Sequence, residues 1–146
     1  MVGKILMGAL VGFLALGVAD RVFAQAEKRQ SLMKNNSENN KAIKGAVEAK
    51  DYATVEAKAK DIMGNADKIV GLFPKGSETG KTKAKPEIWE KSEDFGKAAK
   101  NLSKAAGDLA SAAKAGNADE VGVKVKAMGE ACGACHKQFR AEKYGE

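Results

Sequence analysis

Apolar residues recur at alternating spacings of four and three along three stretches of this chain, which is the spacing that gathers side chains on one face of an α-helix. A fourth, weaker stripe lies closer to the N-terminus, where a polar run interrupts it. The stripe members are Met33, Asn40, Ile43 and Val47; Val55, Ala59, Ile62, Ala66, Ile69 and Phe73; Phe95, Ala98, Leu102, Ala105, Leu109 and Ala112; and Val121, Val125, Met128, Cys132, Cys135 and Phe139. The pattern predicts four amphipathic helices.

Turn and capping residues set the limits of these helices. Asp51 is a candidate N-cap, Gly116 and Asn117 close the third helix, and Asn117 or Asp119 can cap the fourth. The segment 72–86 contains both prolines of the chain with several glycines and lysines, which indicates a solvated loop. The predicted helices span roughly Glu27 to Glu48, Asp51 to Leu72, Glu87 or Ser92 to Ala115, and Asn117 or Asp119 to about Glu142. Because most connections are short, we expect an all-α, antiparallel four-helix bundle.

The N-terminus has the pattern of a secretory signal peptide. A short basic start is followed by an almost wholly apolar run from Ile5 to Val18, and Val22-Phe23-Ala24 resembles a small-residue cleavage site. The run is shorter than the ~20 residues that a comfortable membrane span needs, although an uncleaved anchor is the alternative. We therefore predict a signal peptide over 1–24, a single mature domain over 25–146, and no membrane association after cleavage.

The charge of the chain is modestly basic, with a formal net charge of +6 at pH 7. A nucleic-acid partner is disfavoured because the sequence has no dense Lys/Arg stripe with interleaved aromatic residues. An acidic protein is the better expectation for a partner.

The most specific chemistry lies in the last predicted helix, in the run Cys132-Gly133-Ala134-Cys135-His136. These are the two cysteines and the one histidine of the chain. C-x-x-C-H is the pattern of covalent haem attachment, in which each thiol forms a thioether with one vinyl group and the imidazole ligates the iron. Helical positions i, i+3 and i+4 share a face, so Cys132, Cys135 and His136 can reach one porphyrin.

Two other uses of these residues are known for such a pattern. A redox-active dithiol normally lies in a βαβ context, of which the sequence shows no sign. A structural zinc site needs four ligands, and the chain offers three Cys/His side chains within five residues. The export signal supports the haem reading independently, because c-type haem is attached outside the cytoplasmic membrane in bacteria.

Three segments of the mature chain resemble the cytochrome c′ family. Cys132 to His136 with Phe139 and Arg140 resembles the family's haem helix, Lys85 to Trp89 its loop before the third helix, and Arg29 to Lys34 its haem-contacting start of the first helix. The resemblance implies one covalently attached haem c with its iron, and a bundle in which dimers are common. It also implies that Arg29 and Gln30 lie near the haem propionates.

Met33 decides between two subtypes within this resemblance. High-spin cytochromes c′ usually carry an apolar, non-ligating residue four positions after the helix-one arginine, whereas the low-spin cytochrome c-556 group places a ligating methionine there. Here that position is Met33. Met128 precedes His136 on the same predicted helix and cannot lie trans to it, while Met63 lies just off the stripe of its own helix. Met33 as simple core packing is the alternative.

These observations predict a periplasmic one-electron carrier whose low-spin iron is held by His136 and Met33. We expect its partners to be redox proteins, acidic by charge complementarity, and a homodimer is a further expectation. No enzyme activity is expected, since the sequence offers no catalytic carboxylate pair, activated nucleophile or phosphate loop. The alternative is a five-coordinate, high-spin cytochrome c′ that binds nitric oxide or other small gases.

Overall fold

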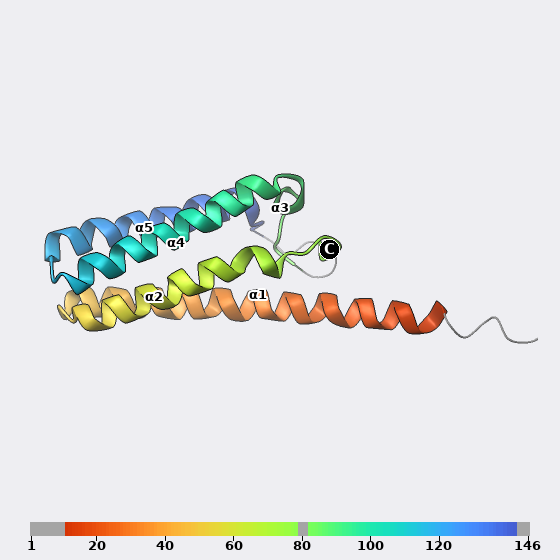
Figure 1. The fold of residues 1–146 in the computed structure, drawn as a ribbon, viewed down its shortest axis with the longest axis horizontal. Coiled ribbons are helices and arrows are strands. Elements are labelled where there is room, and N and C mark those ends of the chain that lie inside the picture. Colours follow the sequence, from red (N-terminus) through yellow and green to blue (C-terminus); the bar gives the residue numbers. More distant parts are fainter. Residues whose placement is uncertain (1–10, 79–81, 143–146) are drawn as a thin grey trace, which may run out of the picture.

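The computed structural model describes residues 11–78 and 82–142, and of residues 11–21 it describes the backbone only. The elements are α1 (Val11–Glu48), α2 (Tyr52–Ile69), the 3-10 turn η1 (Val70–Leu72), α3 (Glu87–Glu90), α4 (Ser92–Lys114) and α5 (Ala118–Phe139). Figure 1 shows two helical hairpins, α1 with α2 and α4 with α5, lying one above the other. The α2 and α4 helices form the central interface between the hairpins. The predicted all-α four-helix bundle is confirmed.

Both hairpin turns are built from residues with the required local chemistry. The Asp51 carboxylate accepts a hydrogen bond from the Thr54 backbone N–H at 3.1 Å, and Asn117 accepts one from Glu120 N–H at 3.1 Å. Each cap satisfies a helix N-terminal donor that would otherwise lack a partner. Gly116 ends the preceding helix with φ at 69°, in the left-handed region that glycine enters without steric cost.

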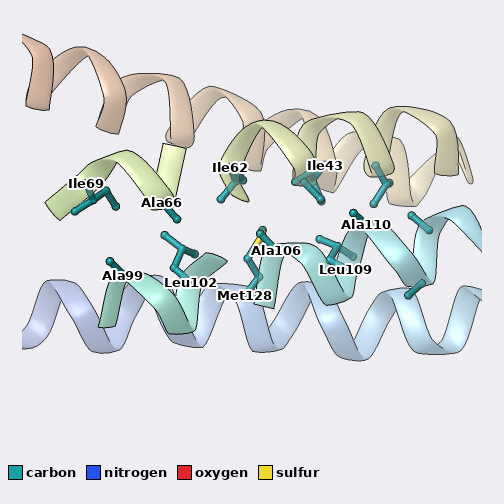
Figure 2. Close-up of a cluster of buried hydrophobic side chains, with 14 of the residues drawn as sticks. Ile43, Ile62, Ala66, Ile69, Ala99, Leu102, Ala106, Leu109, Ala110 and Met128 are labelled. Carbon is teal, nitrogen blue, oxygen red and sulfur yellow. The ribbon is translucent and has the colours of Figure 1, made fainter. Parts of the chain in front are cut away.

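The core follows the predicted stripes of α2 and α4, with one shift of position (Figure 2). In α2 the residues Val55, Ala59, Ile62, Ala66 and Ile69 are buried, as their spacing predicts. In α4 the alanines predicted to face inward, at positions 98 and 105, are half-buried, and Ala99 and Ala106 are buried instead. The reason is that α4 packs against both α2 and α5, so its buried face is wider than a single stripe.

The first helix departs most from the prediction. It starts at Val11 rather than near Glu27, because the apolar segment before the predicted cleavage point contains no proline to end a helix. Its inward polar residue is Asn39, at 4% exposure, and not Asn40. Asn39 donates to the Asn35 side chain at 3.0 Å, and Asn65 of α2 donates to Asn35 at 2.8 Å. This amide cluster explains why the polar run weakens the periodicity yet still faces another helix.

The last helix ends at Phe139 rather than near Glu142. Arg140 adopts an extended conformation and forms a β-bridge with Ala84 of the loop that follows η1. Ala141 N–H donates to Lys83 O at 2.8 Å, and Lys85 N–H donates to Phe139 O at 3.0 Å. These backbone bonds satisfy groups that another turn of helix would have used.

Across residues 11–78 and 82–142, no helix combines the length and the apolar character that crossing a bilayer requires.

Candidate functional site

A cavity of about 590 Å³ opens at the end of the bundle where α5 finishes. Its volume falls within the range of about 300–1,000 Å³ typical of pockets that hold small molecules and cofactors. Its lining comes from α1, from the last turn of α5, from the loop after η1, and from α3 and α4. The lining residues are Ala26, Arg29, Gln30, Met33, Lys34, Ser37, Phe73, Thr82, Lys83, Ala84, Ile88, Phe95, Cys135, His136, Phe139 and Arg140.

Two residues of the C-x-x-C-H run, Cys135 and His136, line this cavity from α5. Burial lowers the pKa of the His136 imidazole, and the nearby Arg140 charge lowers it further. The neutral imidazole is therefore favoured, which is the form that ligates a metal ion. Burial also raises the pKa of the Cys135 thiol, with a smaller contribution from Cys132.

Cys132 lies one turn earlier on α5 and is not among the lining residues of the cavity. It is half-buried and packs against the hydrophobic core, and burial raises the pKa of its thiol. Both cysteines are free thiols. In the described part of the chain, no three His, Cys, Asp or Glu side chains converge on a point that could hold a bare metal ion. The donor set therefore fits a ligand that brings its own iron better than it fits a structural zinc.

Met33 lines the same cavity from a different helix, α1. It is half-buried, and Ser37, one turn later on α1, lines the cavity with it. The other methionines of the described chain lie elsewhere: Met128 is fully buried in the core, and the Met63 sulfur lies 3.2 Å from the position of a Cβ built on Gly107 of α4. Among the methionines that the structure describes, Met33 alone lines the cavity that His136 also lines.

Arg29 and Gln30 both line the cavity, but they differ in environment. Gln30 is exposed, whereas Arg29 is 6% exposed. The Arg29 guanidinium donates from Nε to Leu72 O at 2.6 Å, from Nη1 to Ser77 O at 3.2 Å, and from Nη2 to Ser77 Oγ. Burial lowers the pKa of Arg29, and Glu78 partly opposes this. Three of its five donors thus serve the loop, which the sequence did not predict.

Aromatic side chains form a continuous wall along the cavity. Phe73 packs edge-to-face on Phe95 with ring centroids 5.0 Å apart, and Phe95 packs on Phe139 at 5.2 Å. Trp89 extends this wall, 6.0 Å from Phe73, and its Nε1–H donates to Pro74 O at 3.0 Å. The helical stripes identified the three phenylalanines as inward-facing, but they gave no sign that the rings would meet around a cavity.

Cationic side chains contribute to the lining. Arg29, Lys34, Lys83 and Arg140 come from α1, from the loop and from the residue after α5. No acidic residue of the described chain is among the lining side chains. An apolar wall with a cationic margin suits a flat, largely apolar ligand that carries carboxylates, because each part of such a ligand meets its complement.

Comparison with known proteins identifies relatives of the whole fold. A family model described as cytochrome C′ matches residues 24–140. A cytochrome c′ of Rhodospirillum rubrum is 37% identical over 123 residues, which cover 82% of this chain and 83% of the relative. A cytochrome c-556 of Agrobacterium fabrum is 36% identical over 140 residues, covering 92% of each. A solved cytochrome c′, described as having a ligand-controlled dimer dissociation, is 34% identical with a TM-score of 0.76 and covers 82% of this chain and 95% of its own.

Proposed function

This chain belongs to the cytochrome c′ family and is a haem c electron-transfer protein, and we propose that it carries single electrons with its iron held between His136 and Met33. The observation that carries the proposal is that these two side chains line one cavity from two different helices, α5 and α1. The thiols of Cys132 and Cys135 would form the thioethers. Arg29 and Gln30 line the cavity and would lie near the carboxylates of the cofactor. Bound haem supplies an iron that changes oxidation state by one electron, at a potential that Met/His ligation raises.

The residues around the cavity suit electron transfer in three ways. His136 is favoured in its neutral form and so offers a lone pair for ligation without first losing a proton. The wall of Phe73, Phe95 and Phe139 excludes water from one side of the cavity, which tunes the potential through the local polarity. Met33 would offer a thioether as a second ligand to the iron, so the ligand set need not change when the charge of the iron changes.

The second candidate function is gas binding at an open axial position. The specific observation in its favour is that a cytochrome c′ matches this chain at 37% identity, as closely as the cytochrome c-556 does at 36%. Met33 would then be a packing residue, as methionines often are. We favour ligation because a cytochrome c-556 is among the relatives that match most of the chain, and because the sulfur is soft and suits haem iron.

Substitution of Met33 tests the choice between these functions. Met33→Leu in the haem-loaded protein is expected to convert a low-spin absorption spectrum into a high-spin one, to lower the potential, and to let carbon monoxide bind the reduced protein quickly. Met63→Leu is the matched control, since that residue packs at the α2–α4 interface, and it is expected to leave the spectrum unchanged. A wild-type protein that is already high-spin and binds carbon monoxide quickly would establish the gas-binding alternative instead.

We further propose a periplasmic location after removal of residues 1–24, and a role as a carrier rather than as an enzyme. The support is the signal-like N-terminus and the need for export before haem c is attached. An acidic redox protein would be the partner, because the cavity margin is cationic. A homodimer is consistent with the relative described by its ligand-controlled dimer dissociation. N-terminal sequencing of protein recovered from the periplasm should begin at Gln25.

A further inference from the structure

The two proposed iron ligands lie on helices that are not direct partners in the bundle core. Met33 is on α1, which packs on α2, and His136 is on α5, which packs on α4. The α2–α4 interface therefore connects them only through the middle of the molecule. A thioether–iron bond forms only when the sulfur is held within a narrow distance of the metal. Some contact at the end of the bundle that holds the cavity must therefore fix the distance between α1 and α5.

Arg29 is placed to do this. It lies one turn before Met33 on the same helix and is 94% buried. Its guanidinium binds the chain immediately after α2 through Leu72 O at 2.6 Å, Ser77 O at 3.2 Å and Ser77 Oγ. Ser77 is 2% exposed and in turn donates from Oγ to Pro74 O at 2.6 Å. This network fixes the segment 72–77 against α1.

The same guanidinium also fixes the aromatic wall. Its Cζ lies 4.2 Å from the centroid of the Phe73 ring and 5.8 Å from that of Trp89. From Phe73 the ring contacts continue through Phe95 to Phe139, which lies three residues after His136 on α5. A continuous series of contacts thus runs from the α1 turn that carries Met33 to the α5 turn that carries His136.

We infer that Arg29 is a positioning residue: by binding segment 72–77 and the Phe73 ring, it fixes the separation of α1 and α5 at the cavity and keeps Met33 within reach of the iron. The inference rests on the proposed function, in which Met33 is the sixth ligand. It differs from a role in which Arg29 acts through a cofactor carboxylate, because it requires Ser77 as well. A lysine at this position would keep the charge but would lose the planar fork that bonds Leu72 and Ser77 together.

Carbon monoxide binding to the reduced, haem-loaded protein tests the inference. Carbon monoxide enters only when Met33 has left the iron, so the observed rate reports the fraction of molecules with the ligand detached, and a tenfold larger fraction gives an about tenfold higher rate. Arg29→Lys and Ser77→Ala are each expected to raise this rate and to lower the potential. Lys28→Gln, which changes an exposed charge next to Arg29, is the control and should leave both unchanged.

The double variant separates the possible outcomes. Under the inference Arg29→Lys and Ser77→Ala act through one network, so combining them raises the rate by less than the product of the two single effects. An effect of Arg29→Lys without any effect of Ser77→Ala would overturn the inference in favour of direct action on the cofactor. Variants that lose thermal stability but keep the wild-type rate and potential would show a merely structural role. A wild-type protein that is already high-spin would instead refute the proposed function, and the inference with it.

Discussion

At the scale of single residues, the surroundings of each reactive side chain of the site favour one protonation state. Burial raises the pKa of both thiols and lowers that of the imidazole, so Cys132, Cys135 and His136 are all favoured as neutral groups near neutral pH. A neutral thiol is a weaker nucleophile than a thiolate. The C-x-x-C-H motif could be recognised from the sequence because its residues are close together in the chain and a helix fixes their arrangement.

Replacement of both cysteines tests the proposed attachment site. Cys132→Ala with Cys135→Ala is expected to abolish covalent haem, since no other thiol exists in the chain. The measurement is haem staining after denaturing electrophoresis of protein exported with the attachment machinery. Replacing the exposed Ser92 by alanine provides a control that should retain the stain. Stain that persists in the double variant would mean that the cofactor is held elsewhere.

Arg29 makes hydrogen bonds to the loop after α2 that the sequence did not predict. Its resemblance-based role at the propionates treats it as a partner of the cofactor, whereas the structure places three of its donors on the chain itself. Ser77, which lies 48 positions away, carries two of those contacts. Side-chain contacts at such separations leave no periodic signal in the sequence. The cluster was therefore beyond prediction from spacing alone.

At the scale of elements, helices α2, α4 and α5 were predictable because each buries a stripe of regular spacing. The α1 helix was harder to predict, because its polar run contacts α2 through the amides of Asn35 and Asn36, which accept hydrogen bonds from Asn65. The predicted helix ends were also wrong where tertiary contacts decide where a helix stops. The Arg140–Ala84 bridge, for example, stops α5 at Phe139.

The cap of α2 gives a prediction for the dependence of stability on pH. Hydrogen bonds from Thr54 lower the pKa of Asp51 below its ordinary value of 3.8. The stability that the ionised Asp51 cap contributes is therefore fully present above pH 3.8 and is lost as the pH falls through the lowered pKa. Asp51→Ala is expected to lower the Tm at neutral pH, with a smaller deficit in strong acid. Asp51→Asn keeps a capping oxygen but does not titrate, so it should remove most of this pH dependence. A Tm deficit of Asp51→Ala that is the same at every pH would contradict the assignment.

The contact between α2 and α4 gives a second prediction at this scale. Replacing a helical glycine by alanine stabilises a helix by about 0.5–1 kcal/mol when space allows. Gly96→Ala meets nothing within 4 Å and should give this full gain, whereas at Gly107 the new Cβ would lie 3.2 Å from the Met63 sulfur. Gly107→Ala is therefore expected to stabilise less than Gly96→Ala in denaturant unfolding of the haem-loaded protein. Equal gains would show that Met63 moves aside at no cost.

At the scale of the whole molecule, cationic side chains gather at the cavity where α5 ends. Lys34, Lys83 and Arg140 line it together with the buried Arg29. A partner that docks where the electron leaves would meet this cationic margin first. Electrostatic steering of that kind acts on the association rate more than on the final affinity.

The rate of electron exchange with an acidic partner is therefore expected to fall as salt rises, because charges beyond about 8 Å are screened at physiological ionic strength. Lys34→Gln should lower the rate at low salt, since Lys34 lines the cavity. Lys114→Gln, an equal loss of charge at the other end of α4, is the matched control and should leave the rate nearly unchanged. The measurement is stopped-flow oxidation across a salt series. Equal effects of both variants would indicate that net charge alone matters.

The unbroken course of α1 has a consequence for the order of events in maturation. The helix runs from Val11 to Glu48 and extends past the ends of the other helices in Figure 1, so the Ala24–Gln25 bond lies inside it. Peptidases cut backbone that has opened locally, and a bond within a formed helix is protected in proportion to the cost of that opening. If residues 1–24 are removed as proposed, processing and folding compete for the same stretch of chain. A precursor that is cut as it emerges would start its bundle at Gln25, whereas one that winds α1 first would keep its leader as an extra length of helix.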